Sequence, residues 1–298
     1  MTKDKSLEIS AYIGRIIANQ SPRIRWTSSE LDEFFNTYTP DELEEMRRIG
    51  ILHDPAAFFV MQRFLYSMGL DETEGDYLLP LLTDARCLDA EAFRQNPYIK
   101  SVKTDEKRMG DILLTTASYS RGEILQYTMP DFTADLVTPK LGFFDRTVKF
   151  PTIYEKGTPW MSVCPSEITS MAEPIAHAHG NALVLGLGLG YYPFMISLSD
   201  DVGEITVIEK NKSVITLFER HLLPQFPKKD KIKVICADAI QWLGDCADEY
   251  DFCFADIWEG VHDGLPLYKK IRSLAGRFPK TEFTYWIEKQ MLGADSLG

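Results

Sequence analysis

Three glycines, Gly186, Gly188 and Gly190, stand where the chain is best able to bind a ligand. They lie in the segment LVLGLGLG, which joins an apolar, strand-like run to a helical one. Glycines let the backbone turn tightly and let a ligand lie against the main chain, and the helix that follows would present free amide groups. A dinucleotide-binding turn has the form GxGxxG, which would need a glycine where Tyr191 stands. The spacing therefore favours a ligand that has no pyrophosphate to place on those amides.

Two acidic residues follow the next two strand-like runs, and both suit a nucleoside. Glu209 ends the run TVIE, 19 residues after Gly190, where a carboxylate can accept hydrogen bonds from both ribose hydroxyls. Asp238 follows the run IKVICA, where it could accept a hydrogen bond from an adenine amino group, and the Ala239 amide could address a ring nitrogen. The alternatives are a surface acid for Glu209 and a helix N-cap for Asp238. In register with the glycines, these positions predict contacts to a nucleoside.

Candidate catalytic residues come at and after the end of a fourth run, YDFCFADIW. Asp256 would lie in the crevice at the carboxyl ends of the strands, where open α/β sheets bind ligands. His262 follows in what we expect to be a loop, and a histidine can exchange protons near neutral pH. A solvated loop histidine is the alternative. Either residue could take a proton from a substrate.

The elements that would position these residues alternate between strand and helix. Apolar runs suited to strands lie at 182–185, 205–208, 232–236 and 252–255, and helical segments lie at 191–198, at 212–222 and from 239 onwards. Strands that are apolar on both faces are typical of a parallel sheet covered by helices on both sides. The sequence therefore predicts an α/β fold, with a Rossmann-like and mostly parallel sheet over residues 166–298.

Two other segments precede this domain. Residues 1–108 are rich in helical patterns, with apolar residues at helical spacing over 7–16, a helix start at 39–42 and an apolar run at 56–68. Residues 109–165 hold short β-rich runs broken by turn residues, which is typical of antiparallel hairpins. The expected order is a helical region, a β-rich hairpin region and the Rossmann-like domain.

In order and spacing, the glycine turn and the acids after it resemble the class I S-adenosylmethionine-dependent methyltransferases. The resemblance covers residues 181–257 and implies that S-adenosylmethionine is bound by the residues already named: Gly186, Gly188, Gly190, Glu209, Asp238 and Ala239. At Gly186 the family often has an acid near the methionine amino group, so here that contact is expected from Asp256 or from an earlier carboxylate such as Glu167. Several aromatic residues could shelter the sulfonium by cation–π attraction, or could belong to the core instead: Trp160, Tyr191, Tyr192 and Trp258.

The chain departs from this family after Asp256, which only 42 residues follow. These residues suffice for a helix near 266–275 and for one strand in TEFTYWIE, but not for the family's sixth and seventh strands. The resemblance is therefore to a truncated core, whose last strand would leave an edge of unpaired backbone groups. We expect this edge to be paired or capped by the N-terminal half of the chain, or by a second subunit in a homodimer, and we expect the same material to wall the substrate pocket. The β-rich segment and the apolar Trp286 are the obvious means of covering the edge.

A weaker resemblance is to the spermidine synthases, which share the cofactor fold and carry a β-rich segment before it. Their loop after the fourth strand is rich in aspartate, whereas here it reads DIWEGVHD, which is acidic through Asp256, Glu259 and Asp263 but differently composed. The function implied is methyl transfer from S-adenosylmethionine to a small molecule by direct displacement. Two alternatives stay open, an aminopropyltransferase that uses the decarboxylated cofactor and a cofactor-binding protein without catalysis.

The composition limits partners and location. The formal net charge is −12, so the average field repels a polyanion, and no basic stripe with interleaved aromatics marks a nucleic-acid surface. The five cysteines are scattered, odd in number and without a CxxC pair, which is typical of a reduced cytoplasmic protein with no zinc site. The N-terminus lacks the apolar stretch of a secretory signal, and no run is long enough to span a bilayer. We therefore expect a soluble, cytoplasmic enzyme that acts on small molecules.

Overall fold

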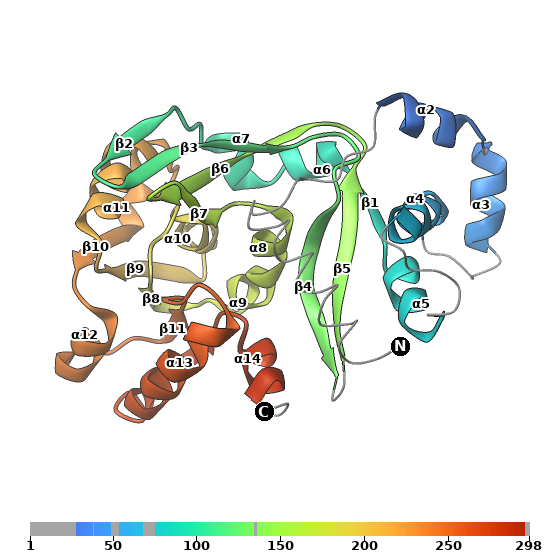
Figure 1. The fold of residues 1–298 in the computed structure, drawn as a ribbon. Helices are drawn as coiled ribbons and strands as arrows, with labels where there is room; N and C mark the ends of the chain where they lie inside the picture. Colours follow the sequence, from blue (N-terminus) through green and yellow to red (C-terminus); the bar gives the residue numbers. More distant parts are fainter. Residues whose placement is uncertain (1–27, 38, 49–53, 68–74, 134–135, 296–298) are drawn as a thin grey trace. The chain divides into compact units, whose positions relative to one another are not determined.

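The computed structural model describes residues 28–37, 39–48, 54–67, 75–133 and 136–295 (Figure 1). The helical pattern at 7–16 lies outside these residues. The chain forms two compact units: unit 1 comprises residues 1–94 and 118–149, and unit 2 comprises residues 95–117 and 150–298. The units interleave along the chain, whereas the three segments expected from the sequence are consecutive. None of the helices in the described ranges is long and apolar enough to cross a membrane.

Unit 1 packs helices against a small sheet. Its helices are α2 (Ser28–Thr37), α3 (Pro40–Arg48), α4 (Pro55–Ser67), α5 (Gly75–Thr83) and α6 (Ala90–Arg94), and its strands are β1 (Arg86–Leu88), β4 (Leu125–Thr133) and β5 (Leu136–Phe144). The sheet order is β1-β5-β4, with β1 parallel and β4 antiparallel to β5. Apolar side chains of α4, such as Phe64 and Leu65, share a core with Phe143 of β5. The expected start of α3 is confirmed, because Thr39 and Glu42 exchange backbone-to-side-chain hydrogen bonds of 2.7 and 3.2 Å in a capping box.

The β-rich segment forms most of a four-stranded sheet in unit 2. Its order is β2-β3-β6-β7, from β2 (Lys107–Met109), β3 (Ile112–Tyr119), β6 (Val148–Glu155) and β7 (Thr158–Ser162). The pairs β2–β3 and β6–β7 are antiparallel, as the sequence predicted for hairpins. Strand β7 directly precedes the helices before the second sheet of the unit, and two of its side chains, Trp160 and Met161, line the candidate site.

The second sheet of unit 2 is the Rossmann-like sheet expected from the sequence. All five strands are parallel, in the order β10-β9-β8-β11-β12, and their bounds are β8 (Gly180–Leu185), β9 (Val202–Glu209), β10 (Ile232–Cys236), β11 (Phe252–Ala255) and β12 (Glu282–Tyr285). The strand order reverses at β8, which has β9 on one side and β11 on the other. The loops after β8 and β11 therefore diverge and leave a crevice at the carboxyl ends of these strands. The predicted fold class is confirmed.

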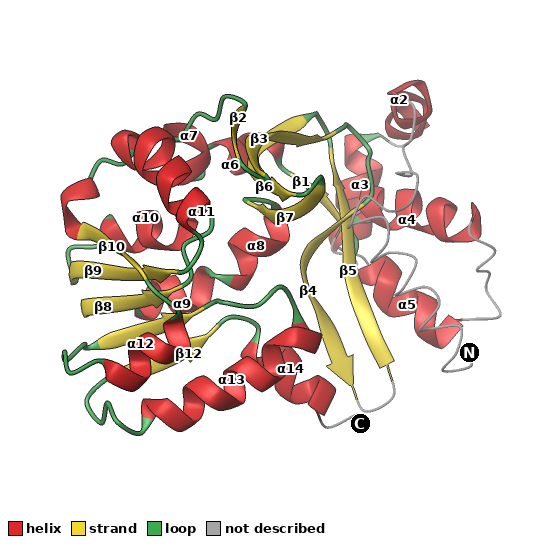
Figure 2. Ribbon diagram, turned by 60° about the vertical axis from the view of Figure 1, so that its left-hand side comes forward, coloured by secondary structure: helices red, strands yellow, loops and turns green. Residues whose placement is uncertain are grey.

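Helices cover both faces of this sheet (Figure 2). Helices α10 (Tyr191–Ser197) and α11 (Lys212–Leu217) lie over one face, and α12 (Ala239–Asp245) and α13 (Val261–Ala275) lie over the other. Because both faces are covered, residues 182–185 of β8 and all of β11 are buried, which explains their apolar sequences. The remaining helical segments of unit 2 are α7 (Pro97–Ser101), α8 (Pro165–Ser170), α9 (Ala172–His177), η2 (Phe218–Leu222), η3 (Leu223–Gln225), η4 (Lys229–Lys231) and α14 (Glu288–Asp295).

The end of the chain has the expected helix and strand, with two differences. Helix α13 begins at Val261 rather than near residue 266. The Asp263 carboxylate causes this early start, because it accepts hydrogen bonds of 2.9 Å from the backbone N–H groups of Glu259 and Gly260. His262, which was expected in a loop, therefore lies in the first turn of α13.

Strand β12 ends the parallel sheet in the described part of the chain. The described strands of the β-rich segment belong to other sheets, so they do not pair with β12, and capping of the edge without pairing stays a prediction. The indole N–H of Trp286, directly after β12, donates a hydrogen bond of 2.8 Å to the Ser170 hydroxyl of α8. This bond ties the end of the sheet to the wall of the candidate site. Coverage of the edge by a second subunit stays a prediction.

Candidate active site

The glycine turn after β8 leaves the sheet at the point where the strand order reverses. Gly186 and Gly188 have φ angles of +100° and +52°, which residues with a side chain rarely adopt. A side chain at Gly186 would also strike the carbonyl oxygen of Asp256. The glycine turn therefore lies directly against the end of β11, so that the turn and the loop after β11 together form one wall of the site.

Gly188 and Gly190 of the turn also have close neighbours, but only Gly188 lines a cavity. A Cβ atom at Gly188 would strike the sulfur of Met161, so this β7 side chain lies on the turn itself. A Cβ atom at Gly190 would strike the ring of Phe218. Gly190 does not line either cavity described below. Its φ of +72° and the packing of Phe218 explain this glycine, and the expected ligand contact is not supported by its position.

Glu209 ties the turn to the end of β9. It is 8% exposed, and its two carboxylate oxygens accept hydrogen bonds from the backbone N–H groups of Leu187 (3.2 Å) and Asn211 (2.7 Å). A carboxylate offers about four acceptor positions, so about two remain for ribose hydroxyls. Asn211 was not singled out from the sequence, although an asparagine between a strand end and a helix is a capping signal. It caps α11 by accepting a hydrogen bond of 3.0 Å from the Ser213 N–H.

Asp238 and Ala239 lie beyond the end of β10 and line the same cavity as Glu209. One carboxylate oxygen of Asp238 accepts a hydrogen bond of 3.0 Å from the Gln241 N–H, so Asp238 is the N-cap of α12. The cap that the sequence offered as an alternative is therefore confirmed. The second oxygen of Asp238 keeps the contact to a ligand compatible with the cap, and that contact stays a prediction.

A cavity of about 460 Å³ joins these positions, and its size is typical of small-molecule sites. Most of the residues predicted from the sequence line it: Gly186, Gly188, Glu209, Asp238, Ala239 and Asp256. Three tryptophans complete its wall, from β7, from the loop after β11 and from the segment after β12: Trp160, Trp258 and Trp286. The larger cavity therefore runs from Glu209 and Asp238, the positions that the sequence predicts for a nucleoside, past the glycine turn, to Asp256.

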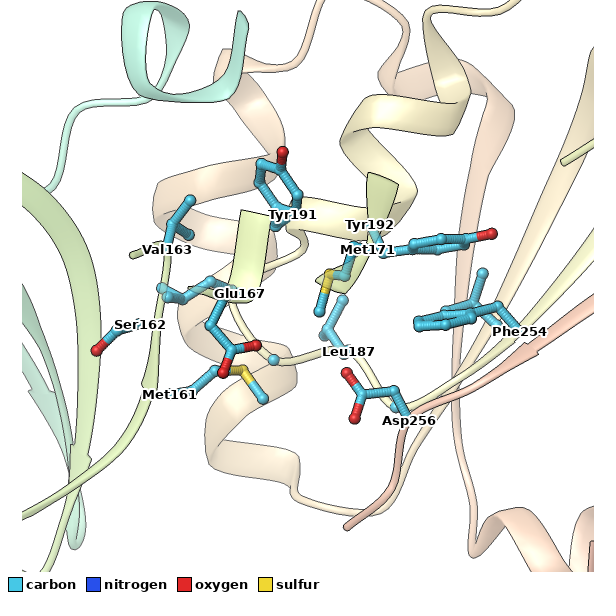
Figure 3. A pocket seen from close by; sticks show the side chains of 14 residues that line it. Met161, Ser162, Val163, Glu167, Met171, Leu187, Tyr191, Tyr192, Phe254 and Asp256 are labelled. Atoms are coloured by element: carbon cyan, nitrogen blue, oxygen red, sulfur yellow. The ribbon is translucent and has the colours of Figure 1, made fainter. Parts of the chain in front are cut away.

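A smaller cavity of about 40 Å³ adjoins the larger one beside the glycine turn. The two cavities share Met161, Glu167 and Asp256 in their walls. Figure 3 shows the carboxylates of Glu167 and Asp256 facing each other, although the two residues come from different elements, α8 and the end of β11. The rest of the wall is mainly apolar and aromatic, from Val163, Met171, Leu187, Tyr191, Tyr192 and Phe254.

The two carboxyl groups are half-buried in these apolar surroundings. Burial raises the pKa of Glu167 to about 7. Burial, together with the negative charge of Glu167, raises the pKa of Asp256 well above its usual range. Among the described residues that line the two cavities, Lys210 is the one basic residue, and it is exposed. A pair of carboxyl groups with raised pKa in a cleft is typical of sites that bind a cation or move a proton.

His262 is the predicted catalytic residue that the structure does not bring to the site. It is exposed on α13 and lies outside the lining of both cavities. Glu167, which the sequence suggested as a contact to an amino group, stands opposite Asp256, and that contact stays a prediction. Met161 was missed altogether, because a methionine in a strand looks like an ordinary core residue.

No family model matches the chain. Among curated proteins, the chain is similar to the polyamine aminopropyltransferase of Korarchaeum cryptofilum, with 30% identity over 77 residues. The match covers 24% of this chain and 24% of that protein, so the chain matches about a quarter of the relative's length.

Similar solved structures include a spermidine synthase from Thermotoga maritima, with 12% identity, a TM-score of 0.34 and coverage of 56% of this chain and 52% of that chain. A putative O-methyltransferase from Klebsiella pneumoniae has 14% identity and a TM-score of 0.29, with coverage of 39% and 58%. A precorrin 8w decarboxylase of Methanobacterium thermoautotrophicum has 17% identity and a TM-score of 0.33, with coverage of 44% and 69%. Both families that the sequence resembles, the methyltransferases and the spermidine synthases, occur among these similar proteins.

Proposed function

We propose that the chain is a transferase that binds an S-adenosyl sulfonium donor and passes an alkyl group to an amine. Decarboxylated S-adenosylmethionine is the donor in this proposal, and the aminopropyl group is transferred. The supporting observation is the pair of carboxyl groups, Glu167 and Asp256, beside the glycine turn. The sequence alone favoured methyl transfer, and this pair is the reason for the change. The curated relative's name, a polyamine aminopropyltransferase, agrees with it.

The nucleoside of the donor fits the end of the larger cavity at β9 and β10. Ribose hydroxyls would donate hydrogen bonds to the free acceptor positions of Glu209, whose carboxylate the backbone already holds in place. The adenine amino group would donate to Asp238, and the Ala239 N–H would donate to a ring nitrogen. The sulfonium would then lie over Gly186 and Gly188, within reach of the aromatic wall.

The tail of the donor decides between aminopropyl and methyl transfer. S-adenosylmethionine carries an ammonium and a carboxylate on its tail, whereas the decarboxylated compound carries the ammonium alone. Beside Glu167 and Asp256 an ammonium is attracted and a further carboxylate is repelled, because the cavity walls supply only the exposed Lys210 as a counter-charge. Between two full charges such an interaction is worth about 4 kcal/mol at a separation of about 4 Å and an effective dielectric constant of about 20. The acid pair therefore favours the decarboxylated donor.

The same pair supplies what the chemistry needs from the protein. When bound, the donor provides a carbon made electrophilic by the sulfonium and a neutral thioether as the leaving group. Glu167 holds the ammonium of the tail, and Asp256 takes the proton that the amine nitrogen loses as the nitrogen–carbon bond forms and the carbon–sulfur bond breaks. A base works best when its pKa lies near the working pH, and burial moves the pKa of Asp256 upward in that direction.

A second candidate is methyl transfer from S-adenosylmethionine to a small molecule. One observation favours it: the loop after β11 differs in composition from the aspartate-rich loop of spermidine synthases, and its acid Asp263 caps α13. In this case Glu167 would contact the ammonium of the donor, and Asp256 would still act as the base. The group transferred and the donor would differ, while the residues would keep their roles.

An assay of the full chain with each donor separates these candidates. Each donor is incubated with and without a diamine, and the nucleoside product is identified by mass spectrometry. Formation of 5′-methylthioadenosine from the decarboxylated donor, only when the diamine is present, supports aminopropyl transfer. Formation of S-adenosylhomocysteine from S-adenosylmethionine with an amine or other small acceptor supports the second candidate. Calorimetric binding of a donor without turnover for any acceptor would identify a cofactor-binding protein.

A further inference from the structure

A short helix far upstream in the sequence holds the glycine turn. Tyr98 of α7 is fully buried, and its hydroxyl donates a hydrogen bond of 2.5 Å to the carbonyl oxygen of Leu189. Leu189 lies between Gly188 and Gly190, at the centre of the turn. Residues 95–117 belong to unit 2, so this contact lies within one compact unit.

Helix α7 is itself fixed beside the turn by Asn96. The side-chain oxygen of Asn96 accepts hydrogen bonds from the backbone N–H groups of Tyr98 (3.0 Å) and Ile99 (3.4 Å), and so caps the helix. Its side-chain N–H₂ donates a hydrogen bond of 3.1 Å to the Tyr191 hydroxyl, at the start of α10. Asn96 and Tyr98 together therefore contact the middle of the turn and the residue directly after it.

The ring of Tyr98 is held independently of its hydroxyl. It makes edge-to-face contacts with the rings of Tyr191, Phe194 and Phe226, at centroid distances of 5.5, 5.2 and 6.0 Å. Burial raises the pKa of the Tyr98 hydroxyl, so it remains a hydrogen-bond donor throughout the physiological pH range. A phenylalanine at position 98 would keep the ring contacts and lose only the bond to Leu189.

We propose that Tyr98 is a positioning residue for the donor, because its hydroxyl keeps the Leu189 peptide in the orientation that leaves the turn open to a ligand. Glycine populates positive and negative φ about equally, so the glycines on either side restrain the Leu189 peptide little. Two hydrogen bonds hold this peptide: its N–H, on Gly190, donates to the Leu187 carbonyl, and its carbonyl accepts from Tyr98. If the turn adopts other orientations in the free protein, the apparent affinity falls with the fraction that is competent to bind. This inference rests on the proposed function, since it assumes that the donor crosses this turn.

The test compares Tyr98→Phe with Tyr127→Phe. Tyr127 is the matched control, because its hydroxyl also donates to a backbone carbonyl, that of Asp84 at 2.8 Å, but in unit 1. For Tyr98→Phe we expect the dissociation constant of 5′-methylthioadenosine and the Michaelis constant of the donor to rise about tenfold, with kcat at saturating donor unchanged. For Tyr127→Phe we expect both constants to stay at the wild-type values. A purely structural role of Tyr98 would lower the melting temperature without this split between the Michaelis constant and kcat.

A second measurement keeps the inference separate from the proposed function. The Gly190 N–H donates a hydrogen bond of 2.8 Å to the Leu187 carbonyl across the turn. Hydrogen–deuterium exchange at this amide should be faster in Tyr98→Phe than in the wild type and in Tyr127→Phe. If the wild type binds no adenosyl compound, the proposed function fails and the exchange rate alone decides whether Tyr98 holds the turn. Unchanged exchange with unchanged affinity in Tyr98→Phe would overturn the inference.

Discussion

The two ends of the larger cavity differ in the surroundings of their carboxylates. At the end proposed for the nucleoside, here called the nucleoside end, Glu209 and Asp238 lie at strand ends, and the backbone already donates hydrogen bonds to them. At the other end, Glu167 and Asp256 face each other in an apolar wall, and burial raises the pKa of both. The first pair is held in place by the fold, whereas the second pair stands where a cationic ligand would stabilise its charges.

From this difference we expect the two ends of the cavity to have separate roles in binding and in turnover. Acids that the backbone orients before a ligand arrives contribute to affinity, because little order is lost on binding. Acids in an apolar wall interact strongly with a nearby charge, and a raised pKa favours proton transfer, so we expect this pair to contribute to chemistry and to the choice of donor. Variants at the nucleoside end should therefore change dissociation constants, and variants at the acid end should change turnover and its pH dependence.

The largest expected effect is that of Asp256→Asn. This change keeps the shape of the side chain and removes the base, so kcat should fall about 10²- to 10⁴-fold, the usual contribution of general base catalysis. The affinity for the nucleoside product should change by less than about threefold, because the nucleoside contacts lie at the other end. Steady-state kinetics and calorimetry measure the two quantities, and Asp200→Asn, at an exposed aspartate, is the control. An equal loss of affinity and turnover would place Asp256 in nucleoside binding instead.

A smaller effect is expected for Glu209→Ala at the nucleoside end. The loss of hydrogen bonds to a charged group should weaken donor binding by about 1.5–3 kcal/mol, or about 10- to 150-fold. Freeing the Leu187 N–H should add to the loss, because Glu209 also fastens the turn. Calorimetry should show unchanged binding for Glu204→Ala, an exposed acid on the same strand. Affinity that survives in Glu209→Ala would contradict the ribose contact.

The smallest effect is on stability, and it depends on pH. The pKa of Glu167 is raised from 4.5 to about 7 in the folded protein. Its contribution to the free energy of unfolding is therefore fully present below about pH 4.5 and is lost as the pH rises towards 7. Glutamine cannot ionise, so this loss is absent in Glu167→Gln. The melting temperature of Glu167→Gln minus that of the wild type should therefore increase by a few degrees between pH 5 and pH 7.5. Glu173→Gln, at an exposed acid on α9, should show no such gain. If the melting temperatures of Glu167→Gln and of the wild type changed in parallel with pH, ionisation of Glu167 would not lower the free energy of unfolding.

The sequence predicted the parallel sheet and most of the residues that line the larger cavity at the ends of β9 and β10, because strand ends and glycine spacing are local patterns. The edge on which Gly186, Glu209, Asp238 and Asp256 meet follows from parallel strand order alone. The sequence could suggest Glu167 only as one acid among several, because the position of α8 depends on packing far along the chain, including the bond between Ser170 and Trp286.

Two residues predicted for the site do not line either cavity, because local effects compete with the sequence patterns. His262 was expected in a loop near the ligand, but the Asp263 cap extends α13 and leaves the histidine exposed on the helix. Gly190 continues the glycine spacing, yet its surroundings are the ring of Phe218 and a left-handed backbone rather than a cavity. Tyr98 lies about 90 residues before the turn that it contacts, a separation that no local pattern bridges.

The choice of donor tests the role of the acid pair most directly. At pH 8, above the pKa of about 7 for Glu167, calorimetry compares the binding of decarboxylated S-adenosylmethionine with that of S-adenosylmethionine, in the wild type and in Glu167→Gln. The wild type should bind the decarboxylated compound at least about tenfold more tightly, since one unfavourable charge contact of about 1.4 kcal/mol suffices for that ratio. The preference should shrink in Glu167→Gln. Tighter binding of S-adenosylmethionine by the wild type, with a ratio that Glu167→Gln leaves unchanged, would contradict the assignment of Glu167 and Asp256 to the donor tail.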